Sequence, residues 1–205
     1  MRTEKLRISD LGLLNYNDGL VLQRMLREAR LAGQSPDTLL LLEHPPTITL
    51  GRSSRANDLR MPREELIERG FEIYEVERGG KATYHGPGQL VGYPILSLRD
   101  LGIGVPRYVA LLEQTVIEFL NELGLEADRR PGSPGVWVGD EKISAVGVHL
   151  RKWASIHGFA INLSPDLAHF RVIVPCGLDQ TEVTSVEAKQ GFAPSMGEAK
   201  RAIAE

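Results

Sequence analysis

The chain has 205 residues, and 24 Lys and Arg against 27 Asp and Glu give it a formal net charge of −3. Its length and 42% hydrophobic content predict a single domain over residues 1–205, with a core of its own. Near-neutral charge argues against a nucleic-acid partner. No apolar run approaches the ~18 residues of a membrane span, and the N-terminus lacks a signal-peptide pattern, so we expect a soluble cytoplasmic protein without a membrane partner.

The few potential metal ligands and thiols limit the chemistry further. Cys176 is the single cysteine, which excludes an intramolecular disulfide and a zinc site built from several thiolates. His85, His149 and His157 show no metal-motif spacing, and a histidine in a strand is usually just hydrogen-bonded. We therefore expect no metal site.

The first half of the chain alternates a helix with short apolar segments. Leu22, Met25, Leu26 and Ala29 follow i, i+3, i+4, i+7 spacing, which predicts a helix near 17–32. The pattern further predicts, in chain order, buried strands over 39–42 and 47–50, a short helix over 62–70 and an extended segment over 71–76.

The second half contains the strongest helix signal and a hairpin pattern. Predicted elements are a strand over 90–96, a helix from Pro106 to about 123, hairpin strands over 136–138 and 142–150, a strand over 153–163 and a helix over 194–205. Because hairpin-connected strands cannot all be parallel, we predict an α+β fold with a mixed, partly antiparallel sheet.

A glycine-rich segment over 78–89 has a composition typical of a binding loop. It matches neither the phosphate-loop nor the dinucleotide-binding glycine spacing, so a nucleotide site is not supported. Its glycines alone are equally consistent with a tight loop that needs positive φ. The polar residues of this segment favour a ligand-binding loop; they are Arg78, Thr83, Tyr84, His85 and Gln89.

Cys176 is the one chemically unusual residue. A free cysteine is most often a small buried hydrophobe, but the flanking Pro175 and Gly177 favour a defined turn. At an ordinary pKa near 8.5 only a few per cent of a thiol is thiolate at neutral pH, so a nucleophile needs a base or positive surroundings. Lys142 opens an apolar strand and is a candidate base, although composition alone favours a solvated hairpin residue.

Small residues alternate on two consecutive predicted strands. Ala145 and Gly147 share one face of the first strand, and Gly158 and Ala160 share one face of the second. If these faces coincide, the missing side-chain volume leaves a narrow apolar slot for a straight chain. Close packing against a helix is the equally weighted alternative.

Three separated segments together resemble the lipoyl(octanoyl) transferase family. They are residues 78–94, residues 142–149 with 157–162, and the tripeptide 175–177, and the resemblance spans about 10–180. It implies one catalytic domain with mixed β-sheets flanked by helices, similar to the catalytic domain of biotin and lipoate protein ligases. Ser144 stands where alanine is common in the family, a change that leaves the implied chemistry unaltered.

The resemblance also implies an activity. An octanoyltransferase of this family moves the octanoyl group from octanoyl-acyl carrier protein to a lysine of a lipoyl domain, the first step of endogenous protein lipoylation. The implied acceptors are lipoyl domains of 2-oxoacid dehydrogenase E2 subunits and the glycine cleavage H protein. No ATP or metal cofactor is implied for the transfer.

Site residues follow from the matching motifs. The resemblance implies that Cys176 holds the acyl thioester and that Lys142 is the base that lowers its pKa. The implied substrate-binding residues are Arg78, Gly79, Gly80, Lys81, Ala82, Thr83, Tyr84, His85, Ala145, Val146, Gly147, Gly158, Phe159 and Ala160.

Three other functions are weighed. An ATP-dependent lipoate or biotin ligase shares the implied fold but needs no cysteine. In a non-catalytic module that binds lipoyl domains, Cys176 and Lys142 would be incidental. A papain-like cysteine hydrolase is the weakest alternative, because Cys176 lacks that family's surrounding residues and a downstream histidine.

Overall fold

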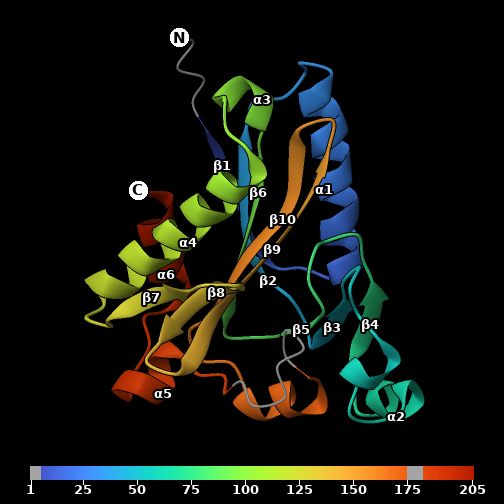
Figure 1. The fold of residues 1–205 in the computed structure, drawn as a ribbon, viewed down its shortest axis with the longest axis vertical. Helices are drawn as coiled ribbons and strands as arrows, with labels where there is room; N and C mark the ends of the chain where they lie inside the picture. Colours follow the sequence, from blue (N-terminus) through green and yellow to red (C-terminus); the bar gives the residue numbers. More distant parts are fainter. Residues whose placement is uncertain (1–5, 175–181) are drawn as a thin grey trace.

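The computed structural model describes residues 6–174 and 182–205, and its largest element is a seven-stranded sheet (Figure 1). In spatial order the strands are β1 (Arg7–Leu13), β2 (Thr38–Glu43), β6 (Gln89–Ile95), β10 (Ala154–Asn162), β9 (Glu141–Arg151), β8 (Ser133–Val138) and β7 (Ala127–Arg130). Only the β1–β2 pair is parallel among these neighbours. The predicted mixed, mainly antiparallel sheet is therefore confirmed.

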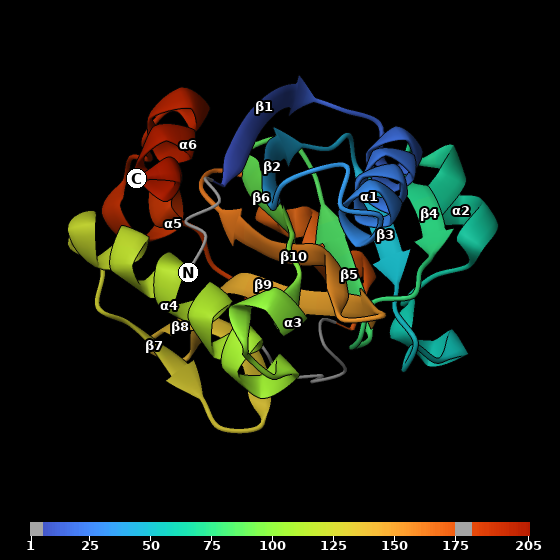
Figure 2. The same cartoon turned by 90° about the horizontal axis from the view of Figure 1, so that it is seen from above.

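A second sheet of three strands lies beside the first. It has the order β4 (Glu72–Glu75), β3 (Thr47–Leu50) and β5 (Ala82–His85), with β3 parallel to β4 and antiparallel to β5. Figure 2 shows this sheet and α2 (Arg63–Glu68) on the side of the molecule away from α4. The sequence predicted β3 and β4 but not β5, which begins inside the glycine-rich segment.

Helices cover both faces of the large sheet. Leu40 and Leu42 of β2 pack in the cluster that includes residues of α1 (Tyr16–Leu31), whereas Leu39 and Leu41 pack in the cluster around α4 (Val105–Glu122). Because successive strand residues point to opposite faces, α1 and α4 lie on opposite sides of the sheet (Figure 1). This double coverage explains why β2 is apolar without alternation.

The remaining short elements complete the layers. They are α3 (Leu98–Leu101), α5 (Val186–Gln190), α6 (Met196–Ala204) and the 3₁₀ helices Ala56–Asp58 and Leu167–Val172. Among the described helices none is long and apolar enough to cross a lipid bilayer.

The predicted helices and hairpin strands are confirmed, with one difference in which face of α1 is buried. Met25, assigned to the apolar face, is 64% exposed, whereas Gln23 is fully buried. The Gln23 Oε1 atom accepts a hydrogen bond of 2.7 Å from the backbone N–H of His157. His157 has a φ of +60°, so a distortion in β10 makes a polar residue necessary on the buried face of α1.

Candidate active site

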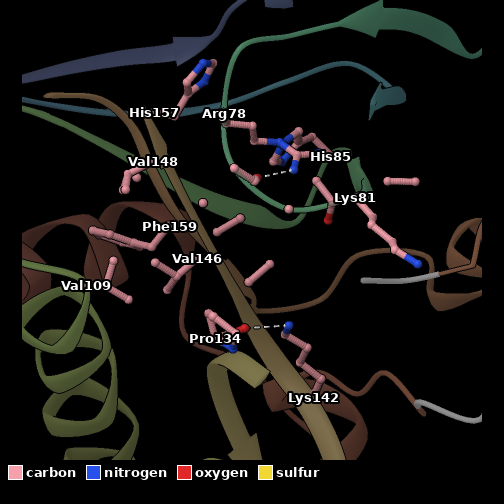
Figure 3. A pocket seen from close by; sticks show the side chains of 18 of the residues that line it. Arg78, Lys81, His85, Val109, Pro134, Lys142, Val146, Val148, His157 and Phe159 are labelled. Atoms are coloured by element: carbon pink, nitrogen blue, oxygen red, sulfur yellow. Dashed lines mark hydrogen bonds between the residues drawn. The ribbon is translucent and has the colours of Figure 1, made fainter. Parts of the chain in front are cut away.

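A cavity of about 420 Å³ lies between β9, β10 and the loop that precedes β5 (Figure 3). Its middle is apolar, because Val109 of α4, Val146 and Phe159 line it. Lys142 lies at one end in Figure 3, and Arg78 and His85 lie toward the other. A cavity that is apolar in its middle and has an amine at one end suits a straight acyl chain whose carbonyl lies at that end.

The two small-residue pairs face each other across β9 and β10, as the slot hypothesis requires. Ala145 pairs with Ala160, and Gly147 pairs with Gly158. Both alanines line the cavity, so small volume there does leave space. At Gly158 close packing also requires a glycine, but against a strand and not the helix of the alternative, because an added Cβ would collide with the backbone oxygen of Gly92 in β6.

Arg78 anchors the loop that forms the opposite wall. Its Nη2 atom donates to both the backbone O and the Oγ1 of Thr49, each at 2.7 Å, and its Nε donates to the same hydroxyl. Gly51 follows β3, and an added Cβ there would lie 2.8 Å from Arg78 Nη1. The arginine is 7% exposed, so β3 holds the loop through a buried cation.

Lys142 is the second residue of β9 and reaches into the cavity from the end opposite Arg78. Its Nζ donates a hydrogen bond of 2.7 Å to the Pro134 backbone oxygen, and the residue is only 5% exposed. An added Cβ at Gly135 would lie 2.5 Å from Lys142 Cε, so this glycine makes room for the lysine. The side chain is buried in a protein-lined position, which excludes the solvated hairpin residue that composition favoured.

The proposed nucleophile, Cys176, lies outside the described residues, as do Pro175 and Gly177. The described chain on either side is attached by backbone hydrogen bonds. Val174 N–H donates to Asp58 O, and the Lys142 backbone donates to Glu182 O and accepts from Thr184 N–H. The strand that carries Lys142 is thus bonded directly to the chain that follows Cys176.

Two neighbouring buried histidines, His85 and His44, lie at the end of the cavity opposite Lys142, which we call the far end. His44 Nδ1 lies 2.7 Å from the Leu14 backbone oxygen and must donate to it, so Nε2 accepts from the Tyr93 hydroxyl at 2.8 Å. Burial lowers the pKa of His44 to about 4 and that of His85 to about 3. Both rings are therefore uncharged near neutral pH.

The structure brings nearly all predicted site residues to this one cavity. Those that line it are Arg78, Gly79, Gly80, Lys81, Ala82, Thr83, His85, Lys142, Ala145, Val146, Gly147, Gly158, Phe159 and Ala160. Among the predicted site residues that the structure describes, Tyr84 is the exception, because alternation along β5 turns its ring to the opposite face, against Phe71 and Phe170. The Tyr84 hydroxyl is 2.8 Å from His169 Nδ1.

Replacing Tyr84 with phenylalanine tests this placement. We expect Tyr84→Phe to lower the free energy of unfolding by about 1 kcal/mol through loss of the bond to His169. The kcat/KM for acyl transfer should stay within twofold of the unaltered protein. Chemical denaturation and steady-state kinetics measure both, and a large loss of kcat/KM without loss of stability would place the hydroxyl in the site.

Several lining residues were not predicted. They are Tyr16, Tyr93, Val105, Val109, Gly132, Ser133, Pro134, Val148 and His157. Val109 belongs to α4, where apolar spacing indicates a core face and does not distinguish core from cavity wall, whereas Tyr16 precedes the helix predicted near 17–32. Within the described residues, no three of His, Asp and Glu are grouped to hold a metal ion.

Solved structures share this fold at low sequence identity. Lipoate-protein ligase A bound with ATP matches with a TM-score of 0.72 and 18% identity, over 97% of this chain and 81% of that one. Biotin protein ligase from Aquifex aeolicus in complex with biotin and ATP matches with a TM-score of 0.59 and 16% identity, over 96% and 66%. The fold therefore defines the class of lipoate and biotin protein ligase catalytic domains, as predicted.

Closer relatives identify the family within this class. The family model of the lipoyl protein ligase A/B catalytic domain matches residues 15–205. An octanoyltransferase of Solibacter usitatus is 50% identical over 88% of this chain and 82% of its own length. One from Myxococcus xanthus is 46% identical over 95% of this chain, which spans 56% of that relative. The chain belongs to the octanoyltransferases of the lipoyl protein ligase A/B family, acyltransferases of protein lipoylation.

Proposed function

We propose that the chain transfers an octanoyl group in two steps through a thioester on Cys176. The position of Lys142 carries the proposal. Its side chain lines the largely apolar cavity, and its backbone is hydrogen-bonded to residues 182 and 184, which follow Cys176 in the chain. An amine on a strand bonded to residues 182 and 184, a few positions after Cys176 in the sequence, is a candidate for the base that a thiol needs at neutral pH.

In the first step, Lys142 takes the thiol proton, and the Cys176 thiolate attacks the octanoyl thioester of an acyl carrier protein. The bond between the octanoyl carbonyl carbon and the donor sulfur breaks, and the departing carrier thiolate takes the proton back from Lys142. One thioester replaces another, so the exchange is close to isoenergetic and needs no ATP.

In the second step, the ε-amine of an acceptor lysine attacks the octanoyl carbonyl. The carbonyl–Cys176 sulfur bond breaks as the amide forms, and Lys142 accepts the proton that the amine loses and passes it to the departing Cys176 thiolate. We propose lipoyl domains as acceptors, including those of 2-oxoacid dehydrogenase E2 subunits and the glycine cleavage H protein. The family description as lipoyl protein ligases supports this class of acceptor.

The octanoyl adduct itself tests the proposal. Mixing the protein with octanoyl-carrier protein, without ATP or acceptor, should add one octanoyl group to Cys176 in an intact-mass and peptide-mass measurement. Hydroxylamine should remove the group, because it cleaves thioesters, and a lipoyl domain should take it up as an amide.

Cys176→Ser serves as the control and should not carry a thioester. Absence of the adduct during turnover would overturn the covalent mechanism. Turnover that requires ATP and persists in Cys176→Ala would identify an ATP-dependent ligase instead. Lipoyl-domain binding without acyl transfer under either condition would identify a binding module.

A further inference from the structure

The far end of the cavity offers a polar group that the proposed reaction does not use. Lys142 and His85 lie toward opposite ends of the cavity in Figure 3. Along β9 the wall continues from Lys142 to Gly147, where an added Cβ would lie 3.3 Å from Arg78 Cδ. If the octanoyl carbonyl lies at Lys142, as the proposed function requires, its methyl end points toward His85.

A chain of buried side chains holds His85 from behind. His85 Nδ1 lies 2.7 Å from Gln89 Oε1, Gln89 Nε2 donates to Asn162 Oδ1 at 2.9 Å, and Asn162 Nδ2 donates to the Thr184 backbone oxygen at 2.9 Å. The exposed fractions of His85, Gln89 and Asn162 are 7%, 2% and 4%. We refer to Gln89 and Asn162 as the amide relay.

Two backbone carbonyls set the direction of the amide relay. The Thr184 oxygen can only accept, so Asn162 must present its amide nitrogen there and its oxygen to Gln89. Gln89 Nε2 then donates to Asn162 Oδ1 and, at 3.2 Å, to the Tyr84 backbone oxygen. Gln89 Oε1 is left facing His85, and since it can only accept, the ring proton is on Nδ1.

This direction determines what His85 presents to the cavity. With one proton on Nδ1, the neutral ring has a lone pair on Nε2 and can only accept there. Burial, together with nearby His44 and Arg78, lowers the pKa of His85 to about 3, so the ring stays neutral near pH 7. The far end therefore carries a fixed hydrogen-bond acceptor, which an alkyl chain cannot satisfy.

We infer that the amide relay holds His85 as a hydrogen-bond acceptor at the far end, and that this acceptor limits the length of the acyl chain that the enzyme transfers. An acyl chain longer than octanoyl would place methylene groups against His85 Nε2, where they exclude any hydrogen-bond donor. A buried acceptor without a donor carries a free-energy cost that opposes the gain from the extra apolar contact. Gln89 and Asn162 are positioning residues in this scheme.

The tautomer is measured by two-bond ¹H–¹⁵N correlation spectra of the full-length protein labelled on histidine, at pH 7. The His85 signal, assigned by its loss in His85→Leu, should show the proton on Nδ1. In Gln89→Leu the proton should distribute over both ring nitrogens. A proton on Nε2 in the unaltered protein would overturn the inference, whether or not the Gln89 variant folds.

Chain-length selectivity is the second readout. The ratio of kcat/KM for octanoyl over decanoyl thioesters of one carrier protein should fall at least about tenfold in His85→Leu, and in the same direction in Gln89→Leu. Gln34→Leu, in an exposed turn, is the matched control and should keep the ratio. An unchanged ratio in folded His85→Leu would contradict the inference.

Failure of the proposed function gives a different pattern from failure of this inference. Without a covalent route, no adduct forms on Cys176 from either thioester, while the tautomer spectrum is unaffected. With a covalent route but no length limit, adducts form at similar rates from both thioesters in every variant.

Discussion

Lys142→Met is expected to lower kcat/KM for octanoyl transfer by roughly 10²–10⁴, the range typical of a lost general base. Methionine has nearly the same length and fills the space beside Gly135, so the loss reports the amine and not a cavity. Without the amine the thiol ionises only at higher pH, because no base takes its proton. The rate of Cys176 alkylation by iodoacetamide should therefore need a higher pH in the variant.

Lysine removal elsewhere provides the control. Lys189→Met breaks an ion pair with Glu141, the residue next to Lys142, and leaves the cavity unaltered. Its kcat/KM and alkylation profile should match those of the unaltered protein. Alkylation of Lys142→Met with an unchanged pH profile would show that the lysine does not act on the thiol.

Gly135→Ala is expected to lower kcat/KM by about 10²-fold, the effect of misplacing a catalytic group by roughly an ångström. The added methyl would lie 2.5 Å from Lys142 Cε and 3.1 Å from its Nζ, and it would collide with the Ser144 backbone oxygen. The side chain must therefore leave its bond to Pro134 O. Steady-state kinetics and a crystal structure of the variant measure the loss and the displacement.

Gly139→Ala separates this displacement from backbone strain. Both glycines have positive φ, +126° at Gly135 and +58° at Gly139, but an added Cβ at Gly139 meets nothing within 4 Å. Gly139→Ala should lower the free energy of unfolding by about 1–2 kcal/mol and leave kcat/KM unaltered. If Gly135→Ala and Gly139→Ala lose kcat/KM equally, the loss comes from backbone strain at positive φ and not from displacement of Lys142.

Local patterns predicted the elements whose causes are local. The helices α1 and α4 follow from apolar spacing, and the β8–β9 hairpin follows from the turn between two apolar runs. The burial of Gln23 could not be predicted, because its cause lies 134 residues away. There the positive φ of His157 directs its backbone N–H toward α1, and Gln23 accepts the hydrogen bond. A polar residue that satisfies a distant backbone group leaves no signal in its own segment.

Most residues of the candidate site were predicted from its sequence motifs. The residues that were misassigned or missed are those whose position depends on tertiary packing. The motif at 78–85 includes Tyr84, whose side chain points away from the cavity because alternate residues of β5 face opposite sides. Val109 lines the cavity but looks like an ordinary helix core residue in the sequence, and Tyr16 lines it from just before the helix predicted near 17–32. The amide relay was also missed, because its members come from β6 and β10 and meet only when these strands pair.

The attachments beside Cys176 have a consequence for protein engineering. Val174 N–H bonds to Asp58 O on one side, and the Lys142 backbone bonds to Glu182 and Thr184 on the other. These bonds use main-chain atoms alone, so they do not depend on which side chains stand at the two attachment points. Side-chain substitutions at these described attachment points, other than to proline, therefore leave every bonding group in place.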